Sequence, residues 1–277
     1  MGGKTYVFID ASNLFYGGKK SLGWTVDYEK LFIYLQQKYQ AEKIYYFGGV
    51  ETFNYQHDYL GCESVDLKGL KIELYSKMSY AADILVSVPA NNLAAKEKLK
   101  ENITNYISEC QAQHKDVQQT AMACSKRFNC EFDAQKIKSF EELRSAYQKT
   151  KFYLKLQNFG YLLVVKPVKF YPQQDGTVTR KANCDVDLTF YLMKEKDNYK
   201  RAVVLAGDGD YLPVLKYLKD LEYEVIILAR SHNTAQEIKK FAGSNFRDFI
   251  MLKKDLEQIE ESQSIKRSGH TKYPLQV

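Results

Sequence analysis

The sequence predicts an α/β protein, with a mostly parallel β-sheet flanked by helices and interrupted by a mainly helical insertion. Short apolar runs of strand length alternate with segments whose apolar residues have helical spacing, which is typical of such sheets. One long interval breaks the alternation and predicts the insertion. The chain has 277 residues, of which 45% are hydrophobic, enough to form a substantial core.

The first strand is predicted at residues 5–9, which are β-branched or aromatic and end at Asp10. Similar runs predict strands at residues 44–47, 161–165, 202–206 and 225–229. Apolar residues at helical spacing predict covering helices around residues 28–35, 188–192 and 212–218. Strands that alternate with helices in this way favour a parallel sheet with helices on its faces.

The insertion is predicted at residues 51–149, about a hundred residues where an ordinary crossover needs about 12. Its Lys-, Glu-, Ala- and Gln-rich stretches carry apolar residues such as Leu99, Ile103 and Ile107 at helical spacing, so we expect helices there.

The α/β domain is therefore expected to be discontinuous, consisting of residues 1–50 and 150–252. Within it, residues 161–171, the Asp-Gly turn at 175–176 and residues 177–179 predict an extended hairpin. Residues 253–277 are polar and lack apolar periodicity, and we expect a flexible tail.

Aspartates follow two of the predicted strands. Asp10 ends the first strand, and Asp208 follows the strand 202–206 after a single glycine. Open parallel sheets bind ligands beyond the carboxyl ends of their strands, where the strand order reverses. The glycines of the run Gly207-Asp208-Gly209-Asp210 permit a tight turn that directs both carboxylates to one point. The alternative is that Asp210 is a helix N-cap and Asp208 a turn residue.

A further carboxylate is expected from Asp185 or Asp187, which open the helix at 188–192 behind a capping Asn183. Residues two apart on a helix point about 200° apart, so only one of them joins the cluster. We select Asp185, because it shares a face with Leu188 and Leu192, and keep Asp187 as a supporting residue.

Three or four converging carboxylates repel one another, and a cation is needed to neutralise them. Oxygen ligands without clustered His or Cys favour Mg²⁺ or Mn²⁺. Such a site binds phosphate oxygens, activates water and stabilises the charge that develops during in-line displacement.

Four segments occur together in one order: YVFIDASNLFY at 6–16, KANCDVDL at 181–188, VVLAGDGDYLP at 203–213, and the strand and helix that follow. In this combination the chain closely resembles NYN domains, relatives of PIN-domain nucleases, over residues 4–50 and 150–252. The resemblance implies a PIN-like fold and metal-dependent cleavage of RNA.

The resemblance also implies roles for individual residues. It supports the metal-binding and catalytic positions Asp10, Asp185, Asp208 and Asp210, with Asn13 as an orienting polar group. Two positions depart from the pattern of many relatives. Ala206 stands where they carry Ser, and Tyr191 stands near the place of another acidic residue, which implies a metal site with fewer ligands.

Basic residues lie close in sequence to the aspartates. Lys169, Arg180 and Lys181 alternate with Phe170 and Tyr171, a mixture that suits contact with phosphates and stacking on bases of single-stranded RNA. A net charge of +6 also favours a polyanionic partner. The alternative is a solvated hairpin with ordinary lysines.

The five cysteines are odd in number, and the chain opens without a signal-peptide pattern, so we expect reduced thiols and a cytoplasmic protein. The spacing of Cys110, His114, Cys124 and Cys130 matches no usual zinc site, which favours separately buried thiols. The longest apolar runs have strand length, so no membrane span is expected.

The leading hypothesis is a Mg²⁺- or Mn²⁺-dependent ribonuclease, an endoribonuclease that hydrolyses phosphodiester bonds at the aspartate cluster. The main alternative is an RNA-binding or scaffold module of the same fold that cleaves slowly or not at all. A metal-dependent phosphatase is a third hypothesis. For the insertion, three roles stay open: a cover for the cleft, a substrate-binding element, or a homo-oligomer interface.

Overall fold

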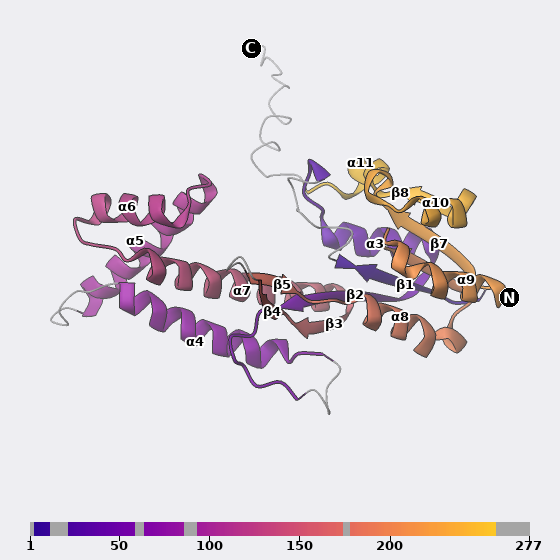
Figure 1. Ribbon diagram of the computed structural model, residues 1–277, viewed down its shortest axis with the longest axis horizontal. Coiled ribbons are helices and arrows are strands. Elements are labelled where there is room, and N and C mark those ends of the chain that lie inside the picture. Colours follow the sequence, from indigo (N-terminus) through magenta and orange to yellow (C-terminus); the bar gives the residue numbers. More distant parts are fainter. Residues whose placement is uncertain (1–2, 12–21, 59–63, 86–92, 174–177, 259–277) are drawn as a thin grey trace, which may run out of the picture. The chain divides into compact units, whose positions relative to one another are not determined.

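A computed structural model describes residues 3–11, 22–58, 64–85, 93–173 and 178–258 (Figure 1). The chain forms two compact units. The first comprises Met1–Gly48, Leu156–Val164 and Asn183–Val277, and the second comprises Gly49–Lys155 and Val165–Ala182. The second unit thus contains the hairpin region 165–182, which the sequence analysis assigned to the α/β domain.

Six of the described strands form one sheet with the order β3-β2-β1-β6-β7-β8. Strand β1 pairs in parallel with β2 and β6, β6 with β7, and β7 with β8. The strands are β1 (Thr5–Asp10), β2 (Ala41–Val50), β3 (Leu162–Pro167), β6 (Arg201–Leu205), β7 (Glu224–Ala229) and β8 (Phe246–Asp248). The predicted α/β fold with a mostly parallel sheet is confirmed.

The central strands form the core of this sheet because both of their faces are covered. All of β1 is buried, and so are Ala202–Leu205 of β6. Near-continuous apolar runs are typical of parallel strands with helices on both faces.

Helices α3 (Tyr28–Tyr39), α8 (Asp185–Lys194), α9 (Leu212–Asp220) and α10 (Gln236–Ala242) belong to the first unit. Helix α3 begins after Asp27, whose carboxylate accepts hydrogen bonds from the backbone N–H groups of Glu29 and Lys30 at 3.1 Å. Helix α8 packs against β1, while α9 and α10 pack against β7.

The start of the expected tail is ordered. Residues Lys253–Leu256 form helix α11, the side chain of Leu256 is fully buried, and the Leu256 carbonyl accepts a hydrogen bond from the Asp27 amide at 2.7 Å. The prediction of a flexible tail from residue 253 was therefore wrong at its beginning, because one buried leucine fixes a segment without any apolar periodicity. Residues 259–277 lie outside the described part of the chain.

The second unit contains four helices among its described residues, so the insertion is mainly helical as predicted. They are α4 (Leu67–Leu85), α5 (Leu93–Ala112), α6 (Val117–Phe128) and α7 (Ala134–Phe159), the last of which continues into the first unit. Side chains from all four form a separate core that includes Leu85, Ile107, Cys124 and Phe140.

The cysteines of the described residues have different environments. Cys110, Cys124 and Cys184 are buried and Cys130 is exposed, while Cys62 lies outside the described residues. Burial, with a smaller contribution from Cys110, raises the pKa of the Cys124 thiol to about 11, so this thiol stays protonated at neutral pH.

The predicted hairpin is shorter than expected. Residues 161–171 were predicted as one extended arm, but the chain leaves the sheet at Val168, whose N–H donates to the Val50 carbonyl at 2.9 Å. The arm is therefore divided into β3 and β4 (Lys169–Pro172), and β4 pairs antiparallel with β5 (Val178–Lys181). The turn at 174–177 lies outside the described residues.

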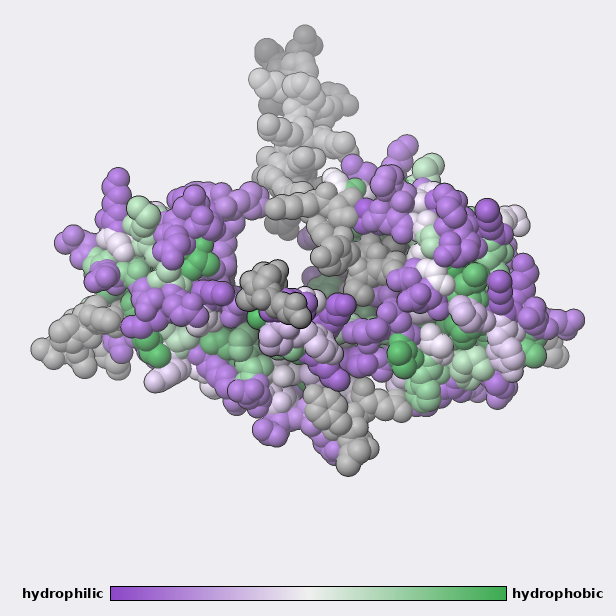
Figure 2. Space-filling view, in the orientation of Figure 1, coloured by the Kyte–Doolittle hydropathy of each residue, from purple (hydrophilic) through white to green (hydrophobic). Residues whose placement is uncertain are grey.

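Hydrophilic residues cover most of the surface visible in Figure 2, and its hydrophobic patches are scattered. Among the described residues, no helix combines the length and the apolar character needed to cross a membrane.

Candidate active site

The strand order reverses between β1 and β6. From β1 the sheet continues through β2 to β3 on one side, and through β6 and β7 to β8 on the other. Ile9 is paired with Leu205, so Asp10 and the turn that begins at Gly207 emerge at the same edge of the sheet. Ligands of open α/β sheets bind at this position, beyond the carboxyl ends of the strands.

A tyrosine hydroxyl joins two of the predicted carboxylates. The Tyr211 hydroxyl lies 3.0 Å from Asp10 Oδ2 and 2.7 Å from Asp185 Oδ1. Asp10 and Tyr211 are buried, whereas Asp185 is half-buried. A phenol has a single proton, so it donates to one of these carboxylates at a time. Residues from β1, α8 and the turn before α9 therefore meet at one point.

The electrostatics of this point favour a bound positive charge. Burial raises the pKa of Asp185, the negative charges of Asp10, Asp208 and Asp210 raise it further, and the hydrogen bond from Tyr211 opposes the increase. Burial and the two adjacent carboxylates also raise the pKa of Tyr211, so its hydroxyl stays protonated.

The Gly207–Asp210 turn packs closely against its neighbours. A side chain on Gly207 would place a Cβ 2.6 Å from Thr234 Oγ1, and one on Gly209 would meet Glu237 Oε1 at 2.5 Å. The Asp208 carboxylate accepts a hydrogen bond from the Asp210 N–H at 3.1 Å, which makes it the cap of a short 3₁₀ turn. Asp210 itself is exposed.

The predicted residues are thus brought together to different degrees. Asp10 and Asp185 share a hydroxyl, while Asp208 and Asp210 are close enough to act on the charge of Asp185. Within the described residues, no three His, Cys, Asp or Glu side chains are arranged to hold a metal ion. Asp187 is half-buried on α8, and Asn13 lies outside the described residues.

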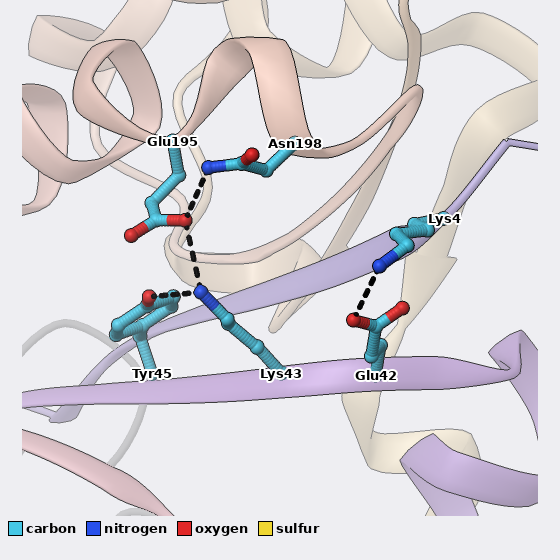
Figure 3. Close-up of polar contacts among 6 residues, drawn as sticks. All are labelled: Lys4, Glu42, Lys43, Tyr45, Glu195 and Asn198. Atoms are coloured by element: carbon cyan, nitrogen blue, oxygen red, sulfur yellow. Dashed lines mark hydrogen bonds and ion pairs between the residues drawn. The ribbon is translucent and has the colours of Figure 1, made fainter.

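Helix α8 is fixed at both ends. At its start, Asn183 Oδ1 accepts a hydrogen bond from the Asp185 N–H at 3.0 Å, as the sequence predicted. At its end, Glu195 Oε2 lies 3.1 Å from Lys43 Nζ on β2 and accepts a hydrogen bond from Asn198 (Figure 3). Because Lys43 is near the amino end of β2, this network anchors α8 at the edge of the sheet opposite Asp10.

Two residues at the site were not predicted from the sequence. No role was predicted for Tyr211, although it directly follows Asp210 in the segment VVLAGDGDYLP. Glu237 is more than twenty residues further along the chain, and nothing in the sequence indicates that it lies against Gly209. Tyr191, near the position where the resemblance implied another acidic residue, packs against Tyr45 and Phe47, with ring centroids 5.2 and 5.6 Å apart.

The three predicted nucleic-acid contacts belong to the β4–β5 hairpin of the second unit. Arg180 forms ion pairs with Glu51 and Glu142 at 3.0 and 2.6 Å. Lys169 and Lys181 are exposed and are direct cross-strand partners. Of the three, only the lysines keep their charges available to a ligand.

The comparisons with known proteins indicate a family over part of the chain. The NYN domain matches residues 114–249, just under half of the chain. This range includes Asp185, Asp208 and Asp210 and leaves out β1 with Asp10. No curated protein matches the chain.

One solved structure is similar, a protein of unknown function from Vibrio parahaemolyticus, with a TM-score of 0.47 and 12% identity over 93% of this chain and 97% of that one. The family match confirms the predicted resemblance to NYN domains within residues 114–249, and this similarity implies a PIN-like nuclease fold.

Proposed function

We propose that the protein is a metal-dependent ribonuclease, an endoribonuclease that hydrolyses phosphodiester bonds in single-stranded RNA. One observation supports this proposal above the others. The carboxylates of Asp10 and Asp185 come from distant parts of the chain and meet at one hydroxyl, beyond the carboxyl ends of β1 and β6. The NYN match over Asp185, Asp208 and Asp210 supports the same chemistry.

The chemistry of the donor atoms at the site suits a divalent cation. Every donor at the site is an oxygen, the ligand atom that Mg²⁺ and Mn²⁺ prefer. Asp185 carries a raised pKa because burial and three neighbouring carboxylates oppose its charge, and a cation between them would remove that opposition. Asp10 and Asp185 would hold the ion, and Asp208 and Asp210 are the proposed additional ligands. When bound, such an ion supplies positive charge to a phosphate and lowers the pKa of the attacking water.

The protein's own residues would perform the remaining work. Tyr211 orients the Asp10 and Asp185 carboxylates through its hydroxyl. Gly207 lets the turn approach Thr234 closely, because a side chain at this position would clash with the backbone and side chain of Thr234. The buried strands behind Asp10 exclude water from one side of the site.

The experiment is cleavage of end-labelled single-stranded RNA by purified protein, with Mg²⁺, with Mn²⁺ and with chelator. Cleavage is expected with either metal and not with chelator, and Asp208→Asn should remove it. Asp197→Asn is the matched control, because this substitution makes the same change of charge at an exposed residue beyond the carboxyl end of α8. Cleavage that persists in chelator, or that both variants retain equally, would contradict the proposal.

A second candidate is an RNA-binding or scaffold module with little or no activity. The observation in its favour is the position of Tyr211, whose hydroxyl lies between Asp10 and Asp185 where an ion is proposed. RNA binding that is independent of metal, without cleavage under any metal condition, would select this candidate.

A further inference from the structure

The β4–β5 hairpin is exposed over nearly all of its residues. Every residue of β4 is exposed, and in β5 only Thr179 is half-buried. An isolated two-stranded hairpin is at best marginally stable in water, so other contacts must hold it in place. In an antiparallel pair, directly opposite residues point to the same face.

Arg180 provides such contacts from one face of the hairpin. Phe170 is opposite Arg180, whose guanidinium lies 5.4 Å from the centre of the Phe170 ring. The same guanidinium is held by Glu51 and Glu142. Arg180 therefore ties the hairpin to other residues of the second unit and has a structural role.

The opposite face consists of Lys169, Tyr171, Thr179 and Lys181, which we call the lysine face. Lys169 is directly opposite Lys181, and Tyr171 is opposite Thr179. Like charges in this position destabilise a sheet, because the Cβ atoms of such a pair are about 4.5–5.5 Å apart. As far as the structure describes the chain, neither lysine has an ion pair, and 47% of Tyr171 is exposed.

We propose that the lysine face binds single-stranded RNA, with Lys169 and Lys181 contacting phosphates and Tyr171 stacking on a base. This inference rests on the proposed function and names the element that would hold its substrate. An anion removes the repulsion between the two lysines. An exposed aromatic ring beside them favours a single strand, because the face of a base is accessible only outside a duplex.

The test is binding of the full-length protein to a fluorescent single-stranded RNA, measured by anisotropy in chelator so that metal-dependent cleavage does not consume the probe. For the double variant Lys169→Ala/Lys181→Ala, the plot of log association constant against log salt concentration should become less steep. The magnitude of its slope should decrease by about 1.4, which corresponds to the loss of two phosphate contacts. Tyr171→Ala should weaken binding about 5- to 150-fold with an unchanged slope, and Tyr171→Phe should restore it.

The control is Lys136→Ala/Lys138→Ala, an exposed pair on α7 of the same unit with the same change of charge. Its salt slope should stay near that of the unmodified protein. Thermal unfolding should show that the lysine-face variant is folded, with no loss of stability, because the substitution removes a like-charge pair.

Equal effects of the two double variants, or an unchanged slope in the lysine-face variant, would overturn the inference. A preference for an acidic peptide over RNA would overturn it as well, since the face would then bind a protein. Failure of the ribonuclease proposal is distinguishable: RNA would still bind through the lysine face, but no metal would produce cleavage.

Discussion

The carboxylates at the two ends of helix α8 have opposite electrostatic environments. At its end, Glu195 is held by the opposite charge of Lys43 and by Asn198, and the pKa of Glu195 is lowered because these hydrogen bonds outweigh the effect of burial. At its start, Asp185 faces other carboxylates, and its pKa is raised. At one edge of the sheet this helix therefore ends in a carboxylate paired with a lysine, Glu195. At the other edge it begins with a carboxylate that faces other negative charges, Asp185.

This difference separates stability from binding. Charges that are paired within the fold stabilise it without a ligand, whereas carboxylates that repel one another destabilise the free protein and favour a cation. Residues at the two ends of α8 should thus respond in opposite directions to the same kinds of substitution. Four measurements can sharpen or break this comparison.

The largest effect is expected from Asp10→Asn. It removes the most buried carboxylate of the proposed metal site, so RNA cleavage in Mg²⁺ should fall about 10²-fold or more. Initial rates on labelled RNA measure this effect, and circular dichroism confirms folding. If the variant cleaves at the rate of the unmodified protein, Asp10 has no part in catalysis, and the carboxylates around the start of α8 are not the catalytic site.

The second effect is a loss of stability from Lys43→Met at the opposite end. The half-buried Glu195 loses its charged partner, which should lower the free energy of unfolding by about 1 kcal/mol. This value is at the lower end of the range of about 1–3 kcal/mol for a buried group that loses its partner, because water reaches the lysine. Thermal unfolding should show a melting temperature lower by about 2–4 °C.

The matched control for this prediction is Lys4→Met, which removes the other lysine drawn in Figure 3. Lys4 pairs with Glu42 at 2.8 Å, but both side chains are about half exposed, so little or no change is expected. Equal destabilisation by the two variants would show that the Glu195 network has no special role.

The third effect has the opposite sign. Asp185→Asn removes one of the repelling carboxylates, so at neutral pH the metal-free variant should melt at a temperature up to about 2–4 °C higher than the unmodified protein. Adding Mg²⁺ should raise the melting temperature of the unmodified protein and should have little effect on the variant. A variant that is less stable, with an unchanged response to Mg²⁺, would show that Asp185 is a structural residue.

The smallest effect is a pH dependence with opposite signs at the two ends. The pKa of Asp185 is raised from its usual 3.8, so its stabilising protonation is lost as pH rises through the folded-state pKa. The pKa of Glu195 is lowered from its usual 4.5, so its contribution is present above that value and is lost as pH falls through the folded-state pKa.

Melting temperatures of the Asp185→Asn and Glu195→Gln variants, each compared with the unmodified protein across this acidic range, measure the two contributions. The advantage of Asp185→Asn should grow as pH rises, and the disadvantage of Glu195→Gln should shrink as pH falls. Parallel pH curves for both variants would mean that the two ends of α8 do not differ.

Much of the fold follows from local sequence. The apolar runs of β1, β6 and β7 predict buried strands because a parallel sheet covered on both faces leaves no polar positions in its centre. Asp10 and Asp208 are predicted at one edge for the same reason, since parallel strands end on the same side. The NYN resemblance was also recognisable from short segments alone.

Other features depended on contacts between residues far apart in the chain. Tyr211 lies between Asp10 and Asp185 because α8 and the turn at Gly207 pack on the sheet in this way. No local sequence pattern predicts this position. The order of Lys253–Leu256 depends on burial of a single leucine. Periodicity reports which face of an element is apolar, but only the tertiary structure decides which side chains from different elements meet, because that depends on their packing in three dimensions.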